Sequence, residues 1–80
     1  MKPKVFHWEG VKLMLVEREE PFMNSTVIMT RAIAPNGGCI PVNFTGKTQK
    51  DFIAQTIAVL DGFARARSKE EVINELTREL

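Results

Sequence analysis

The chain has 80 residues, of which 44% are hydrophobic and 26% charged, and its formal net charge is +1. This length suits one domain, and this composition is typical of a folded globular protein. The near balance of charge argues against a dedicated nucleic-acid module, which usually carries a strong basic excess. One histidine, one cysteine and no tyrosine leave few side chains for acid–base, nucleophilic or metal chemistry. We therefore expect no enzyme, no metal site and no cofactor.

A core of this size is small, and chains this short often need a disulfide, a metal or a second subunit for stability. Cys39 is the single cysteine, so a disulfide within the chain is excluded. The remaining ways to add stability are self-association, as in a homodimer, and docking on a larger partner.

No apolar run approaches the roughly 18 residues that a membrane-spanning helix needs. The first residues, Met1-Lys2-Pro3-Lys4, lead into a short and quickly charged segment that lacks the pattern of a signal peptide. We expect no membrane association and a cytoplasmic location, with which a lone free thiol agrees.

Strands are expected at residues 4–8 and 11–18, joined by a two-residue hairpin turn at Glu9-Gly10. Pro21 lacks a backbone donor and restricts the residue before it, so we expect it to end the second strand. Residues 19–25 are then predicted to form a loop.

The β-branched segment 26–34 predicts a third strand. A turn follows at residues 35–38, where Asn and Gly accept positive φ at low cost. The alternating segment 39–44 predicts a fourth strand, with Pro41 placing it at an edge or a bulge.

Two helices are expected at residues 48–67 and 69–80, with Thr48 and Ser68 as their N-caps. Gly62 lies within the first helix at a cost of about 1 kcal/mol relative to Ala, and we expect it to allow close approach to the sheet. The resulting fold is one α+β domain over residues 1–80: a mostly antiparallel sheet of three to four strands, followed by two C-terminal helices packed on one face.

Gly46-Lys47-Thr48 resembles the end of a phosphate-binding P-loop, but that motif needs a glycine where Pro41 stands. A turn followed by a helix cap is therefore favoured, and nucleotide binding is rejected.

Three further features carry candidate chemistry. His7 has no identifiable acid or nucleophile beside it, so a sheet-surface histidine is favoured. Cys39 has no activating base and is expected to be a small buried or half-buried hydrophobe. The cluster Glu17, Glu19 and Glu20 is interpreted as an exposed, charged strand end rather than a carboxylate site.

Basic residues flank both ends of the first predicted helix: Lys47, Lys50, Arg65, Arg67 and Lys69. They could contact phosphates or an acidic protein, although a solvated helix rim is the favoured interpretation. A stacking platform for single strands would need exposed aromatics here, and Phe52 and Phe63 fall on the apolar stripe instead.

Apolar residues exceed what two short helices can cover. The helices are expected to take up the rows Val11-Leu13-Leu15 and Ile40-Val42-Phe44, leaving Met14 and Val16 on the other face of the sheet. One of two sets from the third strand joins them, either Val27 and Met29 or Ile28 and Ala32. The expected partner-binding residues are Trp8, Met14, Val16, Phe22 and Met23. The alternative is that loop 19–25 folds back over this face.

The segment from Met29 to Phe63 resembles the strand–strand–helix unit of HicB-type antitoxins, through Gly38-Cys39 and the placement of Thr48. The acidic, aromatic N-terminal pattern of that family is missing, so membership is not claimed. In its short length and its lack of recognisable motifs, the chain is also similar to small proteins of bacteriophages and other mobile elements. Many of these, such as anti-CRISPR proteins, bind and block one host protein.

We expect a non-catalytic protein-binding module, an inhibitor or accessory protein of phage type that blocks a host protein complex by occupying it sterically. The alternative is a small nucleic-acid-binding or antitoxin-like regulator. It would use the basic residues at the two ends of the first predicted helix, which we call the basic rim: Lys47, Lys50, Arg65, Arg67 and Lys69. Salt separates the two, because binding to phosphates weakens steeply with ionic strength and an apolar interface does not. A homodimer through the second sheet face would move the partner site to the helices.

Overall fold

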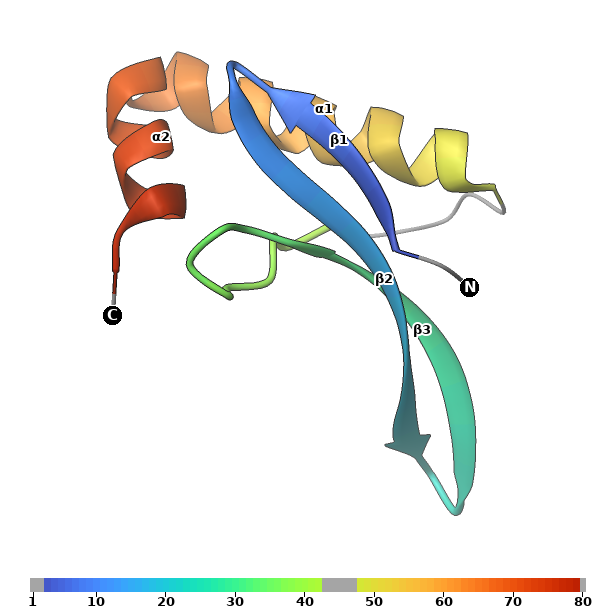
Figure 1. The fold of residues 1–80 in the computed structure, drawn as a ribbon. Coiled ribbons are helices and arrows are strands. Elements are labelled where there is room, and N and C mark those ends of the chain that lie inside the picture. The colour runs from blue at the N-terminus through green and yellow to red at the C-terminus, as the bar shows by residue number, and fades with distance from the viewer. Residues whose placement is uncertain (1–2, 43–47, 80) are drawn as a thin grey trace.

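The computed structural model describes residues 3–42 and 48–79, and these form an antiparallel sheet followed by two helices (Figure 1). The elements in chain order are β1 (Lys4–Trp8), β2 (Val11–Phe22), β3 (Ser25–Ile33), α1 (Gln49–Ala66) and α2 (Lys69–Thr77). Within this part of the chain the sheet has the order β1-β2-β3, with β2 in the centre. The predicted α+β class, the antiparallel sheet and the C-terminal helix pair are confirmed.

The predicted turn between β1 and β2 is confirmed. Glu9 and Gly10 have φ of 49° and 78°, and positive φ at both central residues is what a type I′ turn requires. This turn pairs Trp8 with Val11 and Phe6 with Leu13. Because directly opposed residues share a face, the turn aligns the apolar rows of both strands on the side that the helices cover.

The predicted loop at residues 19–25 is wrong. β2 continues through Pro21 to Phe22, the chain turns at residues 23–24, and β3 begins at Ser25. Pro21 is tolerated because the first residue of β1, Lys4, lies opposite Leu15. β1 therefore does not extend alongside residues 16–22 of β2, and this part of β2 is an edge of the sheet. A proline at an edge needs no backbone donor when its nitrogen faces outward.

The predicted fourth strand is reduced to one bridge, between Ile33 and Cys39. Ala34 N–H donates to the Gly38 carbonyl at 2.8 Å, and Ile40 N–H donates to the Ala32 carbonyl at 2.9 Å. Pro41 follows and has no N–H with which to extend the ladder. The rest of the predicted strand, residues 43–44, lies outside the described residues.

The core lies between the sheet and the two helices. Leu13 and Leu15 are completely buried, and α1 contributes Phe52, Thr56 and Leu60 to the same cluster. Val72 is the buried residue of α2, and Ile40 completes the cluster from the segment after β3. The predicted burial of the row Val11-Leu13-Leu15 is thus confirmed, as is that of Ile40.

Both predicted helix caps are confirmed. Thr48 Oγ1 accepts from Asp51 N–H at 3.2 Å, and Ser68 Oγ accepts from Glu71 N–H at 3.1 Å. Each bond satisfies one of the amides that the first turn of a helix leaves without a partner. Two residues, Arg67 and the cap Ser68, separate α1 from α2, so the chain turns there without a long loop.

Gly62 does not serve a close approach to the sheet. A Cβ built on it would meet only the tip of the Arg65 side chain, at 3.9 Å. The position therefore carries the low helix propensity of glycine without a packing reason for it.

We expect Gly62→Ala to raise the free energy of unfolding by about 1 kcal/mol, because alanine restricts the unfolded chain and fits the helix. Urea unfolding followed by the fluorescence of Trp8, the only tryptophan, measures the change. Gly10→Ala is the control and should lower stability by about 1–2 kcal/mol, because Gly10 has a φ of 78°. Destabilisation by Gly62→Ala would contradict this account of the helix.

Candidate functional site

One face of the sheet is not covered by either helix, and it combines apolar side chains with charged ones such as Arg18, Glu20 and Arg31. Side chains alternate along each strand, so residues out of step with the buried row of β2 point to the opposite side. The β2–β3 register sets Ile33 opposite Met14 and Arg31 opposite Val16. We call this surface the open face; its apolar residues are Val5, Met14, Val16, Phe22, Val27, Met29 and Ile33.

The predicted positions of Met14 and Val16 agree with the structure, since both are half-buried on the open face. Of the two candidate sets on β3, the register places Val27 and Met29 here. Ile28 and Ala32 belong to the helix side. The sequence-based prediction did not include Val5 or Ile33 among the residues of this face. Both lie opposite Met14, so side-chain alternation and the register set by the two tight turns assign them to it.

The far halves of β2 and β3 form an arm, residues 16–31, that extends beyond the three-stranded part of the sheet (Figure 1). β1 reaches only as far as Leu15, so from residue 16 onward these two strands pair with each other alone. The arm accounts for the long dimension of the molecule, 41 Å against 27 and 23 Å. It points away from the helices, so the predicted alternative of a loop folding back over the sheet is wrong.

The tip of the arm carries two large exposed apolar side chains. Phe22 is 59% exposed on the open face, and Met23, in the turn with a φ of 52°, is 81% exposed. Both were predicted as contact residues, and the structure places them next to each other. The tip therefore continues the open face to its outermost point.

Trp8, by contrast, was wrongly placed on the uncovered face. It is only 4% exposed, and its Nε1–H donates to Asp61 Oδ1 of α1 at 2.8 Å. The β1–β2 register puts Trp8 opposite Val11, on the helix side. Its indole thus joins β1 to α1, which combines apolar burial with a satisfied polar group.

An ion pair stiffens the arm on the open face. Arg31 donates from Nε to Glu20 Oε1 at 3.1 Å and from Nη2 to Glu20 Oε2 at 2.5 Å. This two-point geometry fixes the relative position of the two strands. The hydrogen bond from Arg31 lowers the pKa of Glu20 below its ordinary value of 4.5, and the bond to Glu20 raises the pKa of Arg31.

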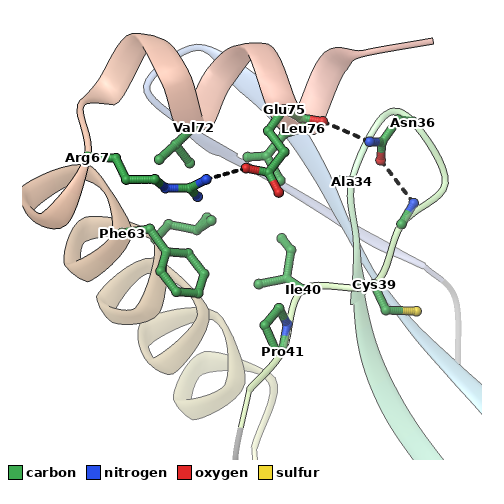
Figure 2. Close-up of a pocket in the computed structure, with 12 residues that line it drawn as sticks. Ala34, Asn36, Cys39, Ile40, Pro41, Phe63, Arg67, Val72, Glu75 and Leu76 are labelled. Atoms are coloured by element: carbon green, nitrogen blue, oxygen red, sulfur yellow. Dashed lines mark hydrogen bonds and ion pairs between the residues drawn. The ribbon is translucent and has the colours of Figure 1, made fainter. Parts of the chain in front are cut away.

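The other titratable candidates do not form one site. His7 is exposed on β1, as predicted, and Glu17 and Glu19 are exposed on the helix side of the arm, beyond the helices. Glu20 lies on the opposite side of the same strand. Cys39 is exposed, so its predicted burial is wrong. The bridge to Ile33 orients its backbone, and Figure 2 shows its thiol pointing away from the core.

The basic rim is partly paired within the chain. Arg67 Nη1 lies 2.5 Å from Glu75 Oε2, and Lys69 Nζ lies 3.4 Å from Glu9 Oε1. Lys50 and Arg65 are exposed at different ends of α1, and Lys47 lies outside the described residues. The four described residues therefore do not gather into one positive surface.

A pocket of about 250 Å³ lies between residues 34–41 and the two helices (Figure 2). Asn36 spans its rim: its Nδ2 donates to the Glu75 carbonyl at 2.9 Å, and its Oδ1 accepts from Gly38 N–H at 3.0 Å. Asn36 N–H also donates to the Leu76 carbonyl at 3.2 Å. These bonds satisfy carbonyls at the end of α2 and attach the turn to that helix. The pocket walls are largely apolar: Ala34, Ile40, Pro41, Leu60, Phe63, Val72 and Leu76.

Polar groups around this pocket are satisfied by one another. The Arg67 guanidinium pairs with Glu75 and also lies 5.7 Å from the centroid of the Phe63 ring, within cation–π range. In residues 3–42 and 48–79, no buried side-chain nitrogen or oxygen lacks a hydrogen-bond partner. The geometry thus explains how the turn, α1 and α2 are held together and points to no ligand.

Over the same residues, no group of three or more His, Cys, Asp or Glu side chains is placed to hold a metal ion. No described helix is both long and apolar enough to cross a membrane. Comparison with models of protein families, with curated proteins and with solved structures finds no match to this chain. The open face and the arm are therefore assigned from their own geometry.

We expect the arm to loosen in acid. The folded-state pKa of Glu20 is lowered, so its pair with Arg31 contributes fully above pH 4.5 and is lost as the pH falls through the lowered value. NMR of backbone amides from about pH 7 to about pH 3 should show shifts concentrated in residues 16–31, with α1 changing less. In Glu20→Gln, which lacks the charge at every pH, this acid transition should vanish. An unchanged transition in that variant would assign it to another carboxyl group.

Proposed function

We propose that this chain is a non-catalytic protein-binding module whose contact surface is the open face with the tip of the arm. The observation that carries the proposal is the set of apolar side chains that extends from Val5 across β2 and β3 to Phe22, with Arg18, Glu20 and Arg31 interspersed among them. Exposed apolar patches, especially those bordered by polar residues, often mark interaction sites on monomeric proteins. Two methionines, Met14 and Met29, add side chains that adapt to the shape of a partner.

The chemistry of the surface favours a protein partner over a nucleic acid. The arm carries three carboxylates, Glu17, Glu19 and Glu20, against two guanidinium groups, Arg18 and Arg31. Phosphate backbones bind where basic charge is in excess. A partner that presents an apolar patch of its own is therefore the complementary surface.

The proposed mode of action is steric occupation. A projecting ribbon whose exposed apolar side chains pack against a partner covers the surface that another protein would use. In this form the chain acts as a small inhibitor or accessory protein, of the kind that phages and other mobile elements direct against a host complex. The support for a phage-type role is the short length of the chain and its lack of recognisable motifs. The support for the contact surface is the exposed apolar side chains of the open face.

The test is affinity capture from a nuclease-treated bacterial lysate with three variants as bait: Met14→Glu, Phe22→Glu and Ala58→Glu. Ala58 is exposed on α1, away from the open face, so it is the matched control for the added charge. We expect the first two variants to lower the affinity for a captured protein by about a hundredfold or more, because a buried carboxylate without a partner is costly. Ala58→Glu should bind as the parent chain does.

Circular dichroism must remain native in all three variants, so that loss of binding reports the surface and not the fold. Binding should also change little between low and moderately high salt. Capture that survives both Met14→Glu and Phe22→Glu would contradict the open-face assignment. Capture that disappears with nuclease or weakens steeply with salt would favour the nucleic-acid regulator instead.

A further inference from the structure

The outer edge of β3 along the arm carries no charge between residues 25 and 30 and contains no proline. Thr26, Val27, Ile28, Met29 and Thr30 all have high or moderate strand propensity. Ile28, in the middle, is 69% exposed. Natural sheets usually protect such an edge with charges, prolines or a covering segment, because a bare edge pairs with other chains.

The other free edges are protected in this way. Along the arm, β2 contains Glu17, Arg18, Glu19, Glu20 and Pro21. The free edge of β1 begins at Pro3-Lys4 and contains His7. The contrast within one small sheet singles out β3 as the edge whose sequence permits pairing.

Two hydrogen bonds near the end of β3 show which of its backbone N–H and C=O groups point to the outer edge of the sheet. The Ala32 carbonyl accepts from Ile40 N–H, and Ala34 N–H donates to the Gly38 carbonyl, both on the outer edge. Because this direction alternates along a strand, Thr26, Ile28 and Thr30 present their N–H and C=O groups to the same edge. Ile40 occupies the edge at Ala32, and Pro41 and Val42 line a hollow beside Thr30 and Arg31 without a backbone hydrogen bond to them. Among the described residues, the stretch 25–31 therefore has no backbone partner on this edge.

This open stretch is symmetric about Ile28. We propose that a second copy of the chain pairs with it edge to edge, antiparallel, around a two-fold axis at Ile28. In that register Ile28 opposes its own copy, Val27 opposes Met29, Thr26 opposes Thr30, and Ser25 opposes Arg31. No like charges face each other, and β-branched and Thr–Thr pairs are favourable cross-strand neighbours.

The arm gains stability from such pairing. As a ribbon of two strands it lacks the third strand that sheets normally need for independent stability in water. Joining two arms makes a four-stranded region and satisfies the outward groups of Thr26, Ile28 and Thr30 in both copies. The contact is small beside a standard interface of about 1,600 Å², so we expect a reversible dimer that dissociates on dilution.

This surface is the edge of β3 and not the open face, so the inference is independent of the proposed function. In sedimentation velocity, the average sedimentation coefficient of the parent chain should rise with concentration from the monomer value toward the dimer value. Ile28→Lys and Ile28→Glu should each remain monomeric at every concentration, because two like charges then meet at the axis. Mixing the two variants in equal amounts should restore the dimer, since opposite charges now face each other.

Ala54→Lys, on the exposed surface of α1, is the matched control and should dimerise as the parent does. A parent chain that stays monomeric throughout would overturn the proposal. So would a dimer that persists in Ile28→Lys and is lost in Met14→Glu, because that result places the contact on the open face. Failure of the mixed variants to associate would exclude the two-fold axis at Ile28.

Discussion

The unequal lengths of β1 and β2 determine most of what lies outside the core. β1 has five residues and β2 has twelve, and the tight turn at Glu9-Gly10 forces them to pair from that end. β2 therefore pairs with β1 over residues 11–15 and with both neighbours only at Met14 and Leu15, and its buried side chains lie in this part of the strand. The remainder pairs with β3 alone and extends as the arm. The change from core strand to exposed ribbon follows directly from where β1 stops.

Within the three-stranded part, a few polar contacts position the helices on an otherwise apolar core. Trp8 is the link between β1 and α1, because its ring is buried while its N–H reaches Asp61. Asn36 provides the corresponding link between the turn after β3 and the end of α2. Contacts of this kind specify one arrangement of helices on the sheet, whereas apolar packing alone would accept several.

The two proposed binding surfaces, the open face and the outer edge of β3, differ in their physical chemistry. The open face offers apolar side chains, and its binding would depend on removing apolar area from water. The edge of β3 offers backbone hydrogen bonds, and its specificity comes from register and from the absence of charge. Both surfaces are available at once, because side chains of a strand project perpendicular to its hydrogen bonds. A paired arm would present two open faces side by side.

The sequence by itself determined the elements whose signals are local. Caps at Thr48 and Ser68, the turn at Glu9-Gly10 and the alternation on β2 depend on neighbouring residues, and each was predicted correctly. Tertiary structure decided what depends on partners far along the chain. Pro21 reads as a strand end until it is known that β1 has already stopped and the edge is free, and Trp8 reads as a surface residue until Asp61 is brought beside it. The exposure of Cys39 was likewise decided by tertiary structure, because its bridge to Ile33 places it on the side of the sheet that the helices do not cover.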